Sequence, residues 1–380
     1  MTNQSDIKLS LIISQRNDAV GTLITIRSAL EEFKSLGRKY EIIIADNSDN
    51  GVQRDAIQDL IPSLYIKEGI IKLIYQPFPS LFSARELAIS KSFGTHLLFV
   101  DSHCLFGRDS ISNLLNFSLT QPGIGFAYGI CCYSHRVEEE GWCDRDVTTS
   151  KGIRLGWYHG QSWAQPFQAP FRGMPFICSR TTFDEIGGYG FLSRHRLAWG
   201  GGDYFLGLKS SLFGFTNWTV PSSLVIHLGP FSNDRYLIQS FLREPARNHP
   251  VRIGMLAAAY ALGGTPLANH RLSGISKLVN QRTLSSAIRL GEEDRRWIQS
   301  RIKVTYNQLV EKFSPLQNYQ VTSVRTEQIP PSKLWPKPVN PRPAPKHPLL
   351  INRGRNTWED RIRDAEQLRN KILQRKRASR

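Results

Sequence analysis

The amino-acid sequence predicts an α/β fold with a mainly parallel sheet, followed by a helical C-terminal extension. Two observations support this prediction. Strand and helix patterns alternate through the first hundred residues, and groups that can bind a cation directly follow one of the strands. With 380 residues, 40% of them hydrophobic, the chain can build one large α/β domain with appendages or two modest domains.

The first predicted strand covers residues 9–14, where the apolar run LSLIIS is long enough for a buried strand. Residues 21–33 follow with helical spacing, because apolar side chains recur at Leu23, Ile26 and Leu30. This pair predicts the first β-α unit of the sheet.

The remaining elements of the N-terminal half repeat this alternation. Strands are predicted at residues 40–45 and 70–75, and a helix at 83–92 leads into a fourth strand at 95–100. Residues 46–51 are rich in Asp, Asn, Ser and Gly, which favour turns. Right-handed crossovers would bring the carboxyl ends of the first, second and fourth strands around one crevice.

Asp101 and His103 come directly after the fourth predicted strand. Ligands of open α/β sheets gather beyond the carboxyl ends of the strands, so both side chains can turn toward a cation there. A carboxylate oxygen with an imidazole nitrogen suits a divalent ion such as Mn²⁺. The alternative is a turn in which Asp101 caps the next segment and His103 is solvated.

The composition predicts the cellular location of the protein and the redox state of its cysteines. No apolar run approaches the roughly 20 residues of a membrane span, and no N-terminal signal pattern is present, so a cytoplasmic location is expected. The five cysteines lack a repeating pair spacing and are expected to be reduced. A zinc site can also be drawn, but its spacing matches no common structural zinc pattern; its residues would be Cys131, Cys132, His135 and Cys143.

The charge distribution separates the C-terminus from the rest of the chain. Of the net charge of +17, residues 331–380 carry +10, from 14 Lys and Arg against 4 Asp and Glu. Eight prolines between Pro330 and Pro348 predict an extended spacer. The tail is either an arm that binds a polyanion or a solvated, partly disordered segment. We divide the chain into an α/β domain (1–235), a mostly helical extension (236–328), a Pro-rich linker (329–350) and a basic helical tail (351–380).

Six segments between about residues 8 and 230 resemble, in order and spacing, the family 2 type glycosyltransferases with a GT-A fold. The sequence is most similar to the polypeptide N-acetylgalactosaminyltransferases. The six segments are Arg16-Asn17-Asp18-Ala19, Ile44-Ala45-Asp46-Asn47-Ser48, Ser83-Ala84-Arg85, Leu98-Phe99-Val100-Asp101-Ser102-His103-Cys104, Gly187-Gly188-Tyr189 with Trp199-Gly200-Gly201-Gly202-Asp203-Tyr204, and Val225-Ile226-His227.

The resemblance implies a UDP-sugar donor and Mn²⁺ or Mg²⁺, with the sugar, a hexose or N-acetylhexosamine, passing to a hydroxyl acceptor. The implied metal ligands are Asp101, His103 and His227, and the implied nucleotide-sugar-binding residues are Asn17, Asp46, Arg85, Asp101 and Ser102. Asp46 would accept a hydrogen bond from the nucleobase, and Arg85 would pair with the base or diphosphate. The alternatives are a turn cap for Asp46, a surface ion pair for Arg85 and a core histidine for His227.

The segment from Trp199 to Asp203 departs from the family pattern. The family usually has two Gly, then Glu, then Asp or Asn, whereas Gly202 stands in the Glu position here. Asp203 is the candidate catalytic base if the enzyme inverts, although the overall likeness favours retention. Trp199 is expected to lie beside the donor sugar or acceptor, or to be a core residue.

The acceptor is inferred from the basic tail. A +10 segment on a proline spacer suits a nucleic acid, and hydroxylated DNA bases are the acceptor that we favour. An extruded base would stack on aromatic residues such as Trp157, Tyr158 and Trp163, which can equally belong to a core or lid. The alternatives are a transferase for polysaccharide or lipid-linked precursors, and a degenerate, non-catalytic nucleic-acid-binding GT-A protein.

Overall fold

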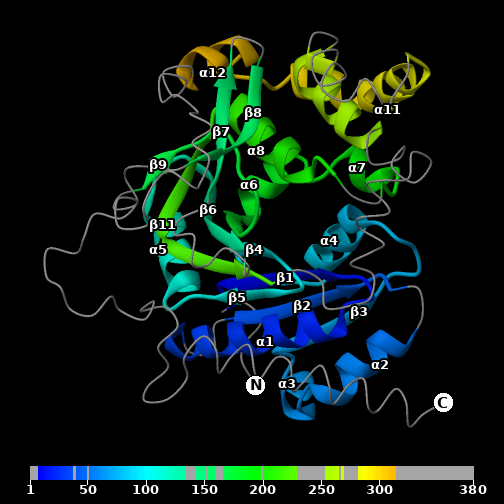
Figure 1. Ribbon diagram of the computed structural model, residues 1–380, viewed down its shortest axis with the longest axis vertical. Coiled ribbons are helices and arrows are strands. Elements are labelled where there is room, and N and C mark those ends of the chain that lie inside the picture. Colours follow the sequence, from blue (N-terminus) through cyan, green and yellow to red (C-terminus); the bar gives the residue numbers. More distant parts are fainter. Residues whose placement is uncertain are drawn as a thin grey trace, which may run out of the picture.

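The computed structural model describes the α/β domain and parts of the helical extension (Figure 1). The described residues are 7–36, 40–48, 51–133, 143–149, 152–158, 166–197, 200–228, 253–264, 267–268 and 281–313. The Pro-rich linker and the basic tail lie outside these residues.

The first hundred residues form the alternating elements that the sequence predicts. In chain order these are β1 (Leu9–Gln15), α1 (Ala19–Phe33), η2 (Lys34–Leu36), β2 (Tyr40–Asp46), α2 (Gly51–Leu60), α3 (Ser63–Lys67), β3 (Ile71–Tyr75), α4 (Leu81–Ser90) and β4 (His96–Asp101). Two predicted helices begin two residues earlier than expected. Helix α1 begins after Asp18, whose side chain accepts a hydrogen bond from the Gly21 amide, and α4 begins after Ser80, which caps it through the Ser83 amide.

Among the described residues, seven further strands and four helices follow in the α/β domain. They are β5 (Cys104–Phe106), α5 (Ser110–Thr120), β6 (Ile124–Tyr133), β7 (Cys143–Thr149), β8 (Gly152–Tyr158), β9 (Phe167–Gln168), β10 (Phe176–Ser179), α6 (Arg180–Glu185), α7 (Phe191–Arg194), α8 (Gly202–Leu212) and β11 (Thr216–His227).

The main sheet is parallel in its first half and mixed in its second. Its strand order is β3-β2-β1-β4-β10-β6-β11-β5, and β9 pairs with β11. Strands β3, β2, β1 and β4 run parallel, as predicted, with Ser14 opposite Asp101 and Gln15 opposite Asp46. Strand β10 is antiparallel to both of its neighbours, and β11 is parallel to β6 but antiparallel to β5. The carboxyl ends of β1, β2 and β4 therefore meet at one edge.

Alternate side chains of the central strands pack into two separate hydrophobic cores, one on each face of the sheet. On β4, Leu97 and Phe99 face the core formed with α4, α6 and α8, whereas Leu98 and Val100 face the core formed with α1, α2 and α5. All four side chains are fully buried. The domain thus has three layers, with helices on both faces of the sheet (Figure 1).

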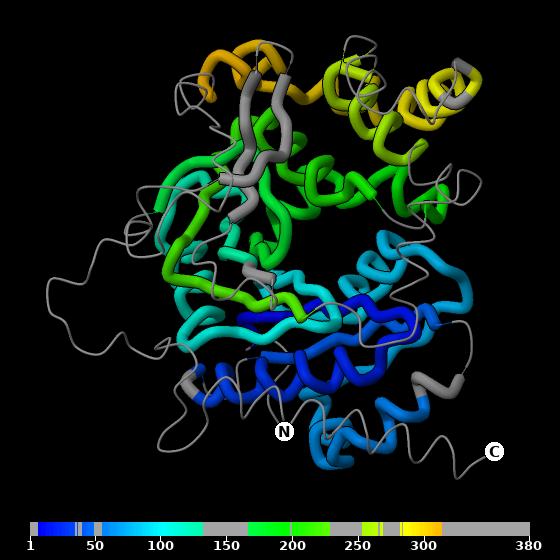
Figure 2. The backbone as a smooth tube through the Cα atoms, viewed as in Figure 1, coloured from blue at the N-terminus to red at the C-terminus, as the bar shows by residue number. Residues whose placement is uncertain are grey.

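The described part of the C-terminal extension is helical, as predicted. A helix over residues 253–264 is followed by α11 (Gln281–Gln299) and α12 (Tyr306–Phe313). Figure 2 shows α11 and α12 on the same side of the sheet as α7 and α8. Asp294 of α11 is 5% exposed and accepts hydrogen bonds from the Phe191 amide and the Arg194 guanidinium, so it ties the extension to α7. In the described part of the chain, no helix combines the length and apolar character of a membrane span.

Candidate metal and nucleotide site

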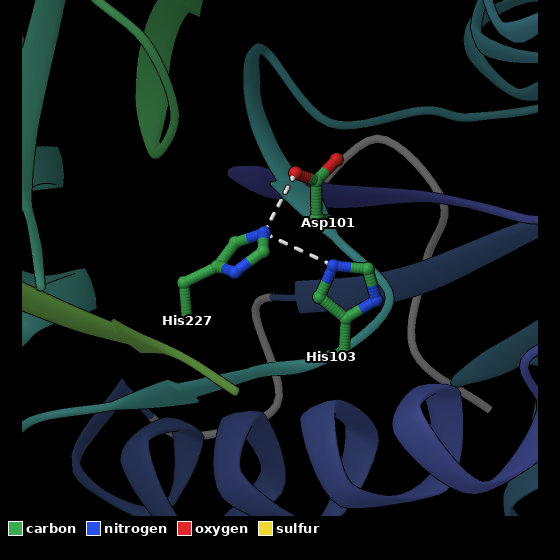
Figure 3. Close-up of side chains that lie close together, drawn as sticks. All are labelled: Asp101, His103 and His227. Atoms are coloured by element: carbon green, nitrogen blue, oxygen red, sulfur yellow. Dashed lines mark hydrogen bonds and ion pairs between the residues drawn. The ribbon is translucent and has the colours of Figure 1, made fainter. Parts of the chain in front are cut away.

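Asp101, His103 and His227 meet at the carboxyl edge of the sheet (Figure 3). Asp101 ends β4, His103 lies in the turn between β4 and β5, and His227 ends β11. Antiparallel pairing of β11 with β5 sets His227 opposite Cys104, next to His103. Potential ligand atoms of the three residues all lie within 4.8 Å of one another.

The geometry of this triad fits a divalent cation. The Nε2 atoms of His103 and His227 are 3.0 Å apart, and His227 Nε2 is 3.5 Å from Asp101 Oδ2 (Figure 3). Donors around one cation at about 2 Å are separated by about 3 Å, so a small ion fits with little rearrangement. One carboxylate with two imidazoles is a donor set for a first-row transition metal such as Mn²⁺.

Charges around the triad keep its carboxylate ionised. Burial alone would raise the pKa of Asp101, but the hydrogen bond with His227 and the charges of His103, His227 and Arg85 lower that pKa to about 2. Burial alone would lower the pKa of His103, whereas Asp18 and Asp101 raise it above its ordinary value. Asp101 is therefore ready to bind a cation at neutral pH, while a proton competes with the cation for the His103 imidazole.

The second cluster lies at the ends of β1 and β2 and contains Asp46. Asp46 is fully buried, and its Oδ1 accepts hydrogen bonds from the Gln15 side chain and the Ser48 amide. Asn17 has a left-handed φ of 55°, which Asn tolerates better than most residues, and its amide donates to Ser48 Oγ at 2.8 Å. Gln15, which the sequence interpretation did not single out, joins the two loops because its Oε1 also accepts from the Asp18 amide at 3.0 Å.

Arg85 of α4 is buried between Asp101 and Asp203. Its Nη2 is 3.6 Å from Asp101 Oδ1, its Nη1 is 3.5 Å from Asp203 Oδ1, and Nη1 donates to the Tyr189 hydroxyl at 3.0 Å. The side chain is 1% exposed, so the alternative of a surface ion pair is wrong. Tyr189 is a second residue that sequence reasoning did not assign to the site, although it lies in a segment that carries the family resemblance.

Ser102 is buried, and its hydroxyl faces Asp18 Oδ2 at 3.4 Å. Asp203 is in the first turn of α8, on the far side of Arg85 from Asp101.

Several residues singled out in the sequence are not described by the structure. Trp199 and Trp163 lie outside the described residues, and of Trp157 and Tyr158 only the backbone, in β8, is described. His135 of the alternative zinc site also lies outside them.

Phe82 occupies the space in which a side chain at position 202 would lie. A Cβ added to Gly202 would overlap the Phe82 ring. This ring is 1% exposed and packs against Tyr189, with centroids 5.3 Å apart. The acidic side chain that the family pattern would place at position 202 is therefore incompatible with the aromatic packing of this chain.

We expect Gly202→Ala to lower the free energy of unfolding by about 1–3 kcal/mol, because the added methyl group overpacks this contact. Denaturant unfolding measures the effect, and Phe82→Leu provides the partner for a double-mutant cycle. The cost of Gly202→Ala should shrink in the Phe82→Leu background. An equal cost in both backgrounds would show that Phe82 is not what excludes the side chain.

The fold is an α/β fold of the GT-A type. Residues 10–176 match the family model "Glycosyl transferase family 2". The matched region runs from β1 into β10 and includes Asp46, Arg85, Asp101 and His103, but not His227. No curated protein sequence gives a significant match.

Among solved structures, the fold is similar to that of GalNAc-T7, which was crystallised with UDP, GalNAc and Mn²⁺. The two share 14% identity with a TM-score of 0.56, and the alignment covers 78% of this chain and 57% of GalNAc-T7. This chain thus spans less than two thirds of GalNAc-T7, and at this identity the likeness establishes the fold. The mannosyltransferase PcManGT from Pyrobaculum calidifontis, solved with GDP-Man and Mn²⁺, is 14% identical, with a TM-score of 0.45 and coverage of 82% of this chain and 88% of PcManGT.

Proposed function

We propose that the protein is a metal-dependent glycosyltransferase that moves a hexose or N-acetylhexosamine from a UDP-sugar to a hydroxyl group. The observation that carries this proposal is the convergence of Asp101, His103 and His227 at the sheet edge where β2 also ends in Asp46. A divalent cation bound there would stabilise, as a Lewis acid, the charge that develops on the leaving nucleotide diphosphate.

In this proposal the donor lies across the ends of β1, β2 and β4. Asp46 would accept a hydrogen bond from the nucleobase in the loop that Gln15 orders, and Asn17 and Ser102 would line the path between the base and the metal. Arg85 would place positive charge beneath the diphosphate, behind Asp101. Mn²⁺ is expected to serve better than Mg²⁺, because two of the three ligands are imidazoles and Mg²⁺ prefers oxygen ligands.

The acceptor would approach from the α8 side, where Asp203 and Trp199 are the candidate catalytic residues. We infer a retaining reaction from the resemblance to the polypeptide N-acetylgalactosaminyltransferases. The pairing of Asp203 with Arg85 is compatible with this inference, because a general base must accept a proton, and a guanidinium held beside a carboxylate opposes that step.

Thermal unfolding with UDP and Mn²⁺, separately and together, tests the donor site. We expect a higher Tm when both are present, since ligands that bind only the native state stabilise it by about 2.7 kcal/mol at one hundred times their Kd. Asp101→Ala should abolish the shift, and Asp59→Ala, which removes an exposed carboxylate on α2, should leave it unchanged. No shift with UDP or other nucleotides would favour the degenerate, non-catalytic binding protein.

For the acceptor we propose hydroxylated bases of DNA, on the strength of the basic tail. We expect the full chain to bind duplex DNA at low salt, more weakly as salt rises, because phosphate contacts release counterions. Deleting residues 331–380 should remove most of this affinity, and electrophoretic mobility shift at several salt concentrations measures it. Binding that is absent, or unchanged by the deletion, would count against DNA; flotation with anionic liposomes then tests the lipid-linked alternative.

A further inference from the structure

The two ring nitrogens of His103 face different partners. Its Nε2 points to His227 Nε2 at 3.0 Å, inside the metal triad. Its Nδ1 lies 2.8 Å from Asp18 Oδ2, a carboxylate outside the triad. His103 is about one-eighth exposed, at 13%, so its orientation is determined by these contacts and by packing rather than by water.

Asp18 is held rigidly enough to orient this imidazole. It is 3% exposed and lies between β1 and α1, where its Oδ1 accepts the Gly21 amide at 3.2 Å and so caps the helix. The other oxygen, Oδ2, is directed to His103 and, at 3.4 Å, to the Ser102 hydroxyl. A Cβ at Gly21 would overlap this carboxylate and would come within 2.6 Å of the Ser102 carbonyl oxygen, so glycine is required for this close approach.

A carboxylate beside Nδ1 has a defined effect on a metal-binding histidine. It accepts a hydrogen bond from Nδ1–H. This hydrogen bond selects the tautomer in which Nε2 is unprotonated and can bind a cation, and it makes Nε2 a better electron-pair donor to the metal. The two oxygens of Asp18 thus have separate tasks, one in the helix cap and one at the imidazole.

We propose that Asp18 is a positioning residue of the metal site, which orients His103 and fixes its tautomer for binding a divalent cation. This inference rests on the proposed function, because it assumes that Asp101, His103 and His227 bind the ion. It assigns to Asp18 a role that is separate from its capping of α1.

Asp18→Asn separates the two tasks. Asparagine is as good a helix cap as aspartate, so the fold should be retained. Asparagine lacks, however, the negative charge of the carboxylate that accepts the hydrogen bond from His103 Nδ1. We expect Mn²⁺ affinity, measured by titration with detection of free Mn²⁺ by electron paramagnetic resonance, to fall by about 10–100-fold. Asp18→Ala should lose as much Mn²⁺ affinity and should also unfold at a lower temperature, because it loses the cap as well.

Asp294→Asn is the matched control, because it neutralises another buried carboxylate that accepts a backbone amide, that of Phe191, away from the triad. We expect its Mn²⁺ affinity to stay within about threefold of the natural chain, well short of the loss expected for Asp18→Asn. If the natural chain binds Mn²⁺ in an Asp101-dependent manner and Asp18→Asn binds it equally well, the role of Asp18 is refuted while the proposed metal site stands. If the natural chain does not bind Mn²⁺ with or without UDP, the metal site itself is refuted.

Discussion

Replacing Arg85 with methionine is expected to lower the free energy of unfolding by about 3 kcal/mol and to abolish nucleotide-dependent stabilisation. The guanidinium is buried and lies between two carboxylates, 3.6 Å from Asp101 and 3.5 Å from Asp203. Without the guanidinium, no positive side chain lies between the two carboxylates. Removing one partner of a buried ion pair typically costs about 3–5 kcal/mol. We take the lower end because the Asp101 and Asp203 side chains are 33% and 32% exposed.

Denaturant unfolding and the UDP and Mn²⁺ thermal shift measure the two effects of Arg85→Met. Arg180→Met is the matched control, because the Arg180 guanidinium also bonds inside the domain, to Gly94, Ile89 and Ser92, but away from the triad. It should destabilise the fold and leave the ligand-induced shift intact. An Arg85→Met protein that is as stable as the natural chain would show that the guanidinium does not hold the two carboxylates together.

The pH dependence of stability is expected to change when Lys209 of α8 is replaced. Lys209 is 1% exposed, and its Nζ donates to the Gly188 carbonyl oxygen at 2.5 Å and lies 4.2 Å from the centre of the Phe205 ring. Burial lowers the pKa of Lys209 from 10.5 to about 7, although Asp294 and Glu86 oppose the change and Arg194 adds to it.

Above pH 7 the folded protein holds Lys209 as a neutral amine, whereas the unfolded chain keeps it protonated up to about pH 10.5. Because the unfolded state then binds more protons, this residue makes the free energy of unfolding rise with pH, by at most about 1.4 kcal/mol per pH unit. Lys209→Met should remove that rise. Urea unfolding between pH 6 and 9.5 measures it.

Lys303→Met, on an exposed lysine, should preserve the slope. If Lys209→Met and the natural chain have parallel stability profiles over this range, Lys209 is charged in the folded state and its partners offset its burial.

The match to the family model covers residues 10–176, which include the part of the chain that local patterns describe best. Strands β1 to β4 are continuous apolar runs, and the helices between them have apolar side chains at helical spacing, so neighbouring residues alone predict a parallel sheet. Asp101 and His103 were found for the same reason, because one strand delivers both. His227 was implied only by the family resemblance, since 124 positions separate it from His103.

The sequence by itself determined the parallel half of the sheet, the edge at which polar groups collect and two of the candidate cation ligands, Asp101 and His103, because these depend on contacts between near neighbours and on a motif. The tertiary structure alone decided that Asp18, 85 positions from His103, holds its imidazole, that Phe82 fills the space beside Gly202, and that one buried guanidinium joins Asp101 to Asp203. The first contact joins the β1–α1 loop to the turn after β4, and the contacts of Gly202 and Asp203 arise when α8 packs against α4. No periodicity along the chain encodes which distant side chains then meet.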